Sequence, residues 1–130
     1  MRYYGAERLN HMFAVRSFLV AGIRATQASD YPPGEFIPMM ALQSAEVTHT
    51  DTKGKIWGPK QKITVEEAIR VGTINGAYAS YEENLKGSIE TGKLADLVVL
   101  GRDPFKENPS TLVTIPVERT MAGGRWTFES

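Results

Sequence analysis

The chain has 130 residues, with fifteen acidic and fifteen basic side chains and no cysteine. This length suits one ordinary domain with a buried core. The balanced charge creates no overall field that favours nucleic acid or an acidic membrane. Without cysteine the chain has no disulfide framework, thiolate nucleophile or thiolate metal site. No segment is apolar for long enough to span a bilayer, and the start lacks a signal-peptide core. We therefore expect a cytoplasmic protein that binds neither nucleic acid nor membrane.

The first third of the chain predicts two helices with a strand between them. Apolar side chains at steps of three and four favour a helix over residues 6–21, and Gly22 is suited to end it in a left-handed conformation. Residues 23–28 (Ile-Arg-Ala-Thr-Gln-Ala) then predict a strand, and the prolines that follow cannot continue a ladder. A second, short helix is expected from Pro38, because proline suits a first helical turn.

Another helix is predicted to begin after Thr64, whose hydroxyl can cap the first turn while Glu67 reaches back to the cap. An apolar stripe follows at helical spacing. Its members are Ala68, Val71, Ile74, Ala77, Tyr78 and Tyr81. Gly72 and Gly76 interrupt this helix at about 1 kcal/mol each relative to alanine, so we expect another element to pack closely against that face. The polar residues 50–62 before the helix predict a loop.

The last third of the chain predicts strands. Residues 87–93 indicate a short strand and a turn, and residues 95–100 indicate a strand buried on both faces. A polar link leads to strand patterns over residues 113–115 and then over residues 117–121. Gly123-Gly124 can turn that strand back into residues 125–128, so the turn chemistry predicts a hairpin.

Residues 87–100 read Gly-Ser-Ile-Glu-Thr-Gly-Lys-Leu-Ala-Asp-Leu-Val-Val-Leu, and Asp103-Pro104 follows. This run closely resembles the C-terminal signature of the amidohydrolase superfamily. Residues 66–68, 73–79 and 82–83 resemble the amidohydrolase-3 branch in particular. Members of the superfamily are metal-dependent hydrolases built on a (β/α)8 barrel, with a small β-sandwich made from both ends of the chain. A run of this length in register is far more specific than a short motif.

The resemblance implies an α/β fold that is the C-terminal end of such a barrel. Residues 1–85 would supply the last helix, strand and helix of the barrel, and residues 86–130 would supply β-strands of the appended β-sandwich. The earlier barrel strands are not in this chain, so the barrel is incomplete. A lone barrel strand presents bare edges that invite association. We therefore expect a homo-oligomer, or a partner that supplies the missing barrel segment.

Asp30 is the candidate catalytic and metal-binding residue. It follows the predicted strand over residues 23–28, and (β/α)8 enzymes carry their working residues at the C-terminal ends of strands. The resemblance implies that an aspartate here binds a divalent metal, in particular zinc, and relays a proton from metal-activated water to the leaving group. Ala28 and Tyr31 depart from the residues usual beside it. The alternative is that Asp30 only caps the turn before Pro32.

The other metal ligands of the family do not appear in this chain. His11 lies on a predicted helix and His49 in a predicted loop, and neither belongs to a ligand motif. We expect ordinary surface or packing roles for both. A catalytic zinc usually takes about three protein ligands. The chain by itself is therefore expected to lack a complete metal site.

Two rival functions have weaker support. Gly87, Gly92 and Lys93 match a phosphate-binding loop except that Leu94 replaces the required hydroxyl residue. A helix precedes this run and a strand follows it, which is the reverse of the required order, so we reject nucleotide binding. The lysines around Trp57 favour a solvated loop over a nucleic-acid patch, because the total charge is neutral.

The sequence thus favours the C-terminal part of a metal-dependent amidohydrolase that cleaves non-peptide carbon–nitrogen bonds in a small-molecule substrate. The alternative is a non-catalytic remnant that acts as an oligomerising or binding module. The two differ in one requirement, because an active enzyme must obtain the missing metal ligands from another chain or from upstream residues. The pocket residues that would select a substrate are expected on the missing loops.

Overall fold

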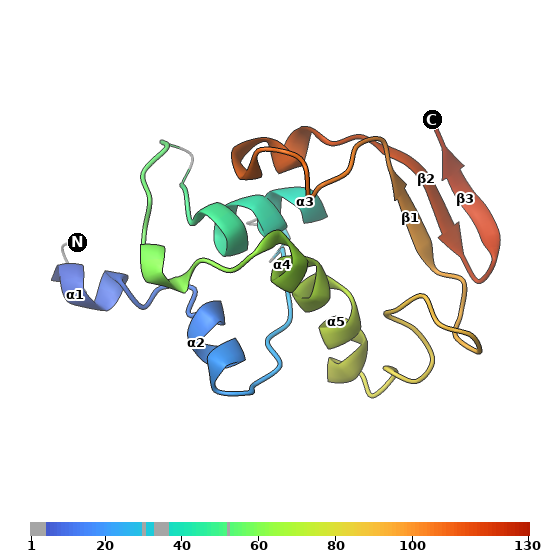
Figure 1. Cartoon of the computed structure of the whole chain (residues 1–130), viewed down its shortest axis with the longest axis horizontal. Coiled ribbons are helices and arrows are strands. Elements are labelled where there is room, and N and C mark those ends of the chain that lie inside the picture. Colours follow the sequence, from blue (N-terminus) through green and yellow to red (C-terminus); the bar gives the residue numbers. More distant parts are fainter. Residues whose placement is uncertain (1–4, 30, 33–36, 52) are drawn as a thin grey trace.

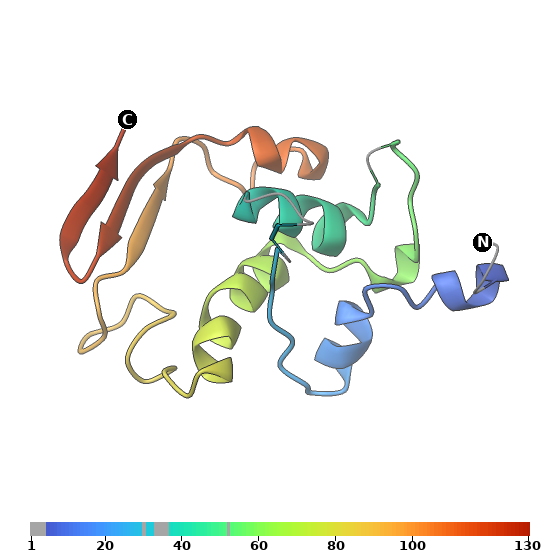
Figure 2. The same ribbon diagram turned by 180° about the vertical axis from the view of Figure 1, so that it is seen from behind.

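The computed structural model describes residues 5–29, 31–32, 37–51 and 53–130. Helices gather at one end of the molecule, next to the N-terminus, and a three-stranded sheet forms the other end, next to the C-terminus (Figures 1 and 2). The chain is thus a small α/β unit. Its elements in order are α1 (Gly5–Leu9), α2 (Val15–Val20), α3 (Pro38–Ala41), the π-helix η1 (Leu42–Thr48), the 3-10 helix η2 (Pro59–Gln61), α4 (Val65–Gly72), α5 (Ile74–Ala79), β1 (Leu97–Leu100), the 3-10 helix η3 (Pro109–Thr114), β2 (Val117–Ala122) and β3 (Arg125–Glu129).

The core lies where η1, α4 and η3 meet. Its buried apolar side chains are Leu42, Val47, Ile63, Ala68, Val71, Leu112 and Ile115. Each large apolar side chain buried in this way contributes about 1.5–3 kcal/mol. A hydrogen bond from the backbone N–H of Val113 to Oε1 of Gln43, at 2.8 Å, adds a polar link between η3 and η1. The core therefore draws on both sides of the division expected near residue 85, which itself stays a prediction.

The helix predicted over residues 6–21 is two helices. A turn separates α1 from α2, and Phe13 in that turn has a φ of +50°. Only α2 reaches the core, where Val15 and Leu19 pack. None of the described side chains of α1 belongs to the core, so core packing does not support a continuous helix here, and short helices are marginal in water. Gly22, with a φ of +75°, ends α2 as predicted, and the backbone N–H of Ile23 donates to the carbonyl of Phe18 at 2.9 Å.

The strand predicted over residues 23–28 is wrong as an element. Residues 23–29, which we call the α2–α3 segment, form no ladder with any other described part of the chain. The segment instead runs past α4 and α5 (Figure 1). A strand pattern becomes a strand only when neighbouring strands supply hydrogen-bond partners, and the described part of this chain offers none at this position. The second helix predicted from Pro38 is confirmed, with Pro38 in the first turn of α3.

The helix predicted after Thr64 begins as expected. The hydroxyl of Thr64 accepts from the backbone N–H of Glu67, and the Glu67 carboxylate accepts from the backbone N–H of Thr64, which completes a capping box. The predicted helix does not run on unbroken, because Thr73 separates α4 from α5 with φ −122° and ψ −92°. Its hydroxyl donates to the carbonyl of Ile69 at 2.7 Å, a local bond that competes with helix continuation.

The sheet is antiparallel in the order β1-β2-β3. Gly123 and Gly124 turn β2 into β3 with φ of +54° and +78°, so the predicted hairpin is confirmed. β1 confirms the strand predicted over residues 95–100, but it is not buried on both faces, since Val98 is 56% exposed. The turn predicted within residues 87–93 is present, whereas the short strand predicted there is not. Residues 113–114, predicted as strand, belong to η3. The described residues cover the sheet only in part, which leaves β1 half open.

None of the helices in the described ranges is long and apolar enough to cross a membrane.

Candidate functional site

Asp30, the predicted catalytic and metal-binding residue, lies outside the described residues. What the structure describes is how the chain that leads to Asp30 is held. The α2–α3 segment ends one residue before it, and three side-chain contacts attach this segment to the helices. They come from Asn75, Gln27 and Arg24.

The least exposed of these contacts is made by Asn75 in the first turn of α5. Its Nδ2 donates to the backbone carbonyl of Ala25 at 2.9 Å, across fifty residues of sequence. Asn75 is only 9% exposed. Asn75 is the second residue of α5, which begins after the break at Thr73, and its side chain faces the α2–α3 segment. The bond satisfies a buried amide and a carbonyl that has no ladder partner.

The other two contacts are more exposed. Nε2 of Gln27 donates to the carbonyl of Pro38 at 2.9 Å, which links the α2–α3 segment to the start of α3. The guanidinium carbon of Arg24 lies 4.2 Å from the centre of the Tyr78 ring, a cation–π contact with α5. Exposed contacts of these kinds contribute little to stability on their own. The Asn75 bond is the least accessible to water of the three.

The close packing expected at the helix glycines is present at one of the two. A methyl group on Gly72 would lie 2.9 Å from Oε1 of Gln27, so Gly72 leaves room for the Gln27 side chain. A methyl group on Gly76 would meet no described atom within 4 Å. The expectation is therefore confirmed for Gly72 and wrong for Gly76.

The two histidines lie in different environments. His11 is in the exposed turn after α1, whereas His49 is buried at the end of η1, only 3% exposed. Nδ1 of His49 lies 3.0 Å from the carbonyl oxygen of Trp57, and Nε2 has no hydrogen-bond partner among the described residues. The ring also meets Phe13 edge to face, with centroids 6.4 Å apart. Burial lowers the pKa of His49, so the ring is held neutral at pH 7.

The described residues do not by themselves fit a metal ion. Within the described ranges, no three His, Asp or Glu side chains come together as ligands. His49 is enclosed by Phe13 and the Trp57 loop rather than by carboxylates. Asp51, the acidic residue nearest to it in the chain, accepts from Nε1 of Trp57 at 2.9 Å and from two backbone amides of its own loop. Asp51 therefore stabilises the loop over residues 51–57, and it forms no set of metal ligands with His49.

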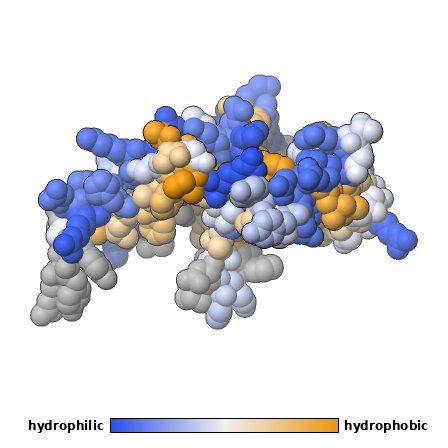
Figure 3. Space-filling model, turned by 90° about the horizontal axis from the view of Figure 1, so that it is seen from below, coloured by the Kyte–Doolittle hydropathy of each residue, from blue (hydrophilic) through white to orange (hydrophobic). Residues whose placement is uncertain are grey.

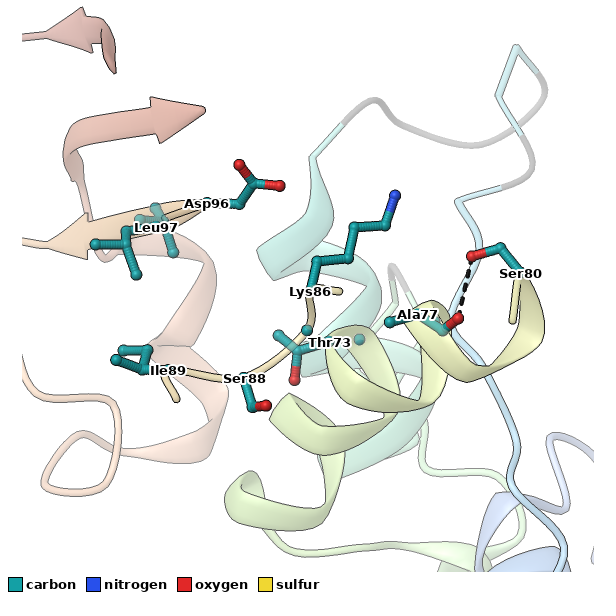
Figure 4. A pocket seen from close by; sticks show the side chains of 12 residues that line it. Thr73, Ala77, Ser80, Lys86, Ser88, Ile89, Asp96 and Leu97 are labelled. Atoms are coloured by element: carbon teal, nitrogen blue, oxygen red, sulfur yellow. Dashed lines mark hydrogen bonds between the residues drawn. The ribbon is translucent and has the colours of Figure 1, made fainter. Parts of the chain in front are cut away.

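One groove opens in the described structure that the sequence did not indicate. Its volume is about 520 Å³, and it lies between the α4–α5 pair, residues 86–89 and the start of β1 (Figure 4). Both charged side chains in it already have partners. Nζ of Lys86 pairs with Glu82 at 2.8 Å, and Oδ1 of Asp96 accepts from the backbone N–H of Gly123 at 2.7 Å. Small and apolar groups make up most of the rest, so the groove suits packing rather than acid–base chemistry.

The turn at residues 87–93 is closed by its own side chains. Nζ of Lys93 donates to Oγ of Ser88 at 2.6 Å, and Oγ of Ser88 donates to Glu90 at 2.6 Å. These bonds close the turn that precedes β1. The run leads into a strand and not into a helix, which agrees with the rejection of a phosphate-binding loop.

Known proteins resemble this chain along most of its length. A sequence model described as "Amidohydrolase family" matches residues 1–128. The N-substituted formamide deformylase of Arthrobacter pascens is 40% identical over 118 residues, which are 91% of this chain and 22% of that protein. The Bacillus subtilis protein YtcJ is 29% identical over 127 residues, which are 96% of this chain and 24% of that protein.

The fold agrees. The crystal structure of an amidohydrolase from Thermotoga maritima MSB8 matches with a TM-score of 0.68 at 24% identity, over 92% of this chain and 26% of that one. The chain belongs to the amidohydrolase family, which confirms the resemblance seen in the sequence. It spans about a quarter of the length of the relatives that it matches.

Proposed function

We propose that this chain is the C-terminal part of a metal-dependent amidohydrolase that hydrolyses non-peptide carbon–nitrogen bonds in a small molecule. The observation that carries the proposal is the 40% identity to N-substituted formamide deformylase over 91% of this chain. That relative's name specifies cleavage of a formyl group from nitrogen. In this proposal the helices and the α2–α3 segment are the end of a (β/α)8 barrel, and β1 to β3 belong to the appended β-sandwich.

Asp30 is the residue to which we assign chemistry. A carboxylate at this place would accept a proton from the attacking water and return it to the leaving nitrogen, as general base and then general acid. It would also be one ligand of a divalent metal, with zinc as the first candidate. Because the described residues do not form a metal site on their own, the remaining ligands have to come from outside them.

The proposal requires a partner for this chain. The partner would be the missing barrel segment, whether it is continuous with this chain or separate from it, and self-association is the outcome that we expect when that segment is absent. The cytoplasmic location expected from the sequence remains a prediction.

A graft tests the function. The C-terminal segment of the Arthrobacter deformylase that corresponds to this chain is replaced by residues 1–130, and release of formate from an N-substituted formamide is measured. We expect a folded, metal-loaded and active graft. In the graft, Asp30→Asn should lower kcat by a factor of about 10²–10⁴, the usual contribution of a positioned acid–base group. Elemental analysis and circular dichroism establish metal content and folding.

The matched control is Glu129→Gln, which removes a carboxylate from the exposed end of β3 and should leave the activity unchanged. A folded, metal-loaded graft without activity would contradict the proposed function. Full activity of the Asp30→Asn graft would contradict the role of Asp30 alone.

A further inference from the structure

Gly76 lies inside α5, where glycine is about 1 kcal/mol less favourable than alanine. A methyl group on it would meet no described atom within 4 Å, so the described structure gives no packing reason for a glycine here. The residue before it is Asn75, and no other asparagine of the sequence is followed by glycine. The consequence of this glycine is therefore chemical.

An asparagine that precedes glycine is able to modify itself, and asparagine is one of the thermolabile residues. The backbone nitrogen of Gly76 attacks Cγ of Asn75 and loses its proton to solvent base. The bond from Cγ to Nδ2 breaks, and Nδ2 takes a proton from solvent and leaves as ammonia. Water then opens the cyclic imide at either of its carbonyls, which yields aspartate or isoaspartate at position 75. Glycine suits the attack because no side chain shields its nitrogen and its backbone rotates freely.

The fold opposes this reaction at Asn75. Closing the imide ring requires a rotation about the Cα–C bond of Asn75 that takes this residue of α5 out of the helical region. Its Nδ2 also donates to the carbonyl of Ala25 at 2.9 Å, which directs the side chain to the α2–α3 segment and away from its own backbone. Asn75 is 9% exposed, so solvent base and water have little access to it. The reaction therefore requires α5 to separate from the α2–α3 segment.

We propose that Asn75-Gly76 is a site of spontaneous deamidation, which the fold suppresses and which reacts when α5 separates from the α2–α3 segment. The reaction makes this separation permanent. An aspartate carboxylate at position 75 cannot donate to the carbonyl of Ala25 and repels it, and isoaspartate adds a backbone carbon that an α-helix does not accommodate. Local openings occur more often than global unfolding, so the site reacts without loss of the whole fold.

Ageing of the 130-residue chain at pH 8, in native buffer and in urea, tests the proposal. A brief tryptic digest at mildly acidic pH releases residues 71–86, and mass spectrometry locates deamidation within this peptide. The peptide also contains the exposed Asn84, which precedes leucine and is the internal reference. In urea, Asn75 should deamidate at least about tenfold faster than Asn84, because glycine leaves the attacking nitrogen open. In native buffer the Asn75 rate should be lower than in urea by a factor of about 10², as expected of a group that reacts only from an opened state.

Three variants locate the step that exposes the site. Gly76→Ala fits the open space beside α5 and should abolish the fast reaction in urea, because its side chain shields the attacking nitrogen. Arg24→Ala removes the cation–π contact between the α2–α3 segment and α5. It should raise the native rate at Asn75 by a factor of about 2–5, which corresponds to the loss of one exposed contact of this kind. Arg119→Ala removes the cation–π contact between β2 and β3 and is the matched control, which should leave the native rate unchanged.

Hydrogen exchange measures the consequence of the reaction. The deamidated chain carries an additional negative charge, so anion exchange separates it from the unmodified chain. Backbone exchange in residues 23–29 should be at least about tenfold faster in the deamidated chain, while exchange in β2 should not change. The variant Asn75→Asp should show the same local loss of protection without ageing.

Four results would overturn the inference. Equal Asn75 rates in native buffer and in urea would mean that the fold does not control the reaction. An Asn75 rate in urea no higher than that of Asn84 would mean that the glycine does not promote it. A native rate that Arg24→Ala leaves unchanged would mean that separation of the α2–α3 segment does not expose the site. Unchanged exchange of residues 23–29 in the deamidated chain would mean that the reaction does not keep the segment apart. All of these measurements are independent of the proposed function.

Discussion

Nη1 of Arg16 lies 2.9 Å from Oε1 of Glu67, and this ion pair ties α2 to the first turn of α4. The same carboxylate accepts from the backbone N–H of Thr64 at 2.8 Å. One residue thus serves the start of α4 and the packing of α2. The acceptor bond to the Thr64 amide is the main reason that the pKa of Glu67 is lowered. Because the ion pair itself is half exposed, the cap is the stronger contribution.

The first prediction concerns this cap. Thr64→Ala removes the hydroxyl that accepts from the Glu67 amide and should lower the free energy of unfolding by about 1 kcal/mol, while Thr64→Ser should change it little. Urea unfolding of the 130-residue chain measures both. Thr91→Ala, in an exposed turn, is the matched control. Equal stability of the alanine and serine variants at position 64 would show that the cap contributes nothing.

The second prediction concerns pH and His49. Burial lowers its folded pKa below the unfolded value of 6.5, so below pH 6.5 the unfolded chain binds a proton that the folded chain does not. The contribution of His49 to the free energy of unfolding is therefore fully present above pH 6.5. It should fall as the pH drops from 6.5 towards 5. Carboxylates with lowered pKa values change the free energy of unfolding only below about pH 4.5. A loss of stability between pH 6.5 and pH 5 therefore reports on histidine.

The substitution that tests it is His49→Asn, because His49 has a φ of +53° and asparagine tolerates that region. Urea midpoints measured between pH 7 and pH 5 should decline less in this variant than in the unmodified chain. His11→Asn, in an exposed turn, should keep the original slope. An unchanged slope in the His49 variant would mean that the buried ring titrates as it does in the unfolded chain.

The third prediction compares two glycines that face the same groove. Gly87 has a φ of +93°, and a methyl group there would lie 2.8 Å from Cβ of Ala77 and 3.0 Å from Cα of Ile74. Gly87→Ala should therefore destabilise the fold by about 2 kcal/mol or more, from backbone strain and from overlap with α5. Gly76→Ala meets open space inside a helix and should stabilise by about 0.5–1 kcal/mol. Thermal unfolding of both variants checks the opposite signs.

The features that the sequence could predict are those with a local cause. The cap at Thr64 depends on a residue three positions away, and the hairpin at Gly123-Gly124 depends on the turn itself. The prediction of a strand over residues 23–28 was wrong because side-chain pattern alone does not form a strand. A strand also needs neighbouring strands as hydrogen-bond partners, and the described residues supply none here. Residues 113–114 also have strand-forming side chains, but they became helical where Leu112 and Ile115 enter the core.

The candidate site also has one part that the sequence could predict and one part that it could not. The family signature allowed Asp30 to be named from sequence, but its surroundings depend on chain that the described structure does not contain. Asn75 was not singled out, because nothing in a helical pattern says whether an amide faces solvent or a distant carbonyl. Its partner Ala25 is fifty residues away. A hint was present in the position of Asn75 among the apolar residues Ile74 and Ala77, where a polar side chain needs a partner.

The last prediction concerns association of the isolated chain. Apolar and aromatic side chains remain exposed on α2, the α2–α3 segment, α5 and the turn after it. They are Phe18, Val20, Ile23, Tyr78 and Tyr81, with Val20 75% and Tyr81 91% exposed. Figure 3 shows scattered apolar patches among polar ones on one face of the molecule. Large exposed apolar patches mark interaction surfaces. The outer edge of β1, which pairs with no strand in the described ranges, adds a second such surface. We therefore expect dimers or larger species that form with increasing concentration.

Light scattering across a concentration series measures this association. The double substitution Val20→Ser and Ile23→Thr should shift the equilibrium towards monomer, because it removes apolar area from the exposed face without touching the core. Phe105→Ser is the matched control, since Phe105 is 63% exposed and belongs to the loop between β1 and η3. Figure 1 shows this loop away from α2 and α5. A chain that stays monomeric at high concentration would contradict the prediction. It would mean that the exposed side chains of α2 and α5 are too dispersed among polar groups to drive association.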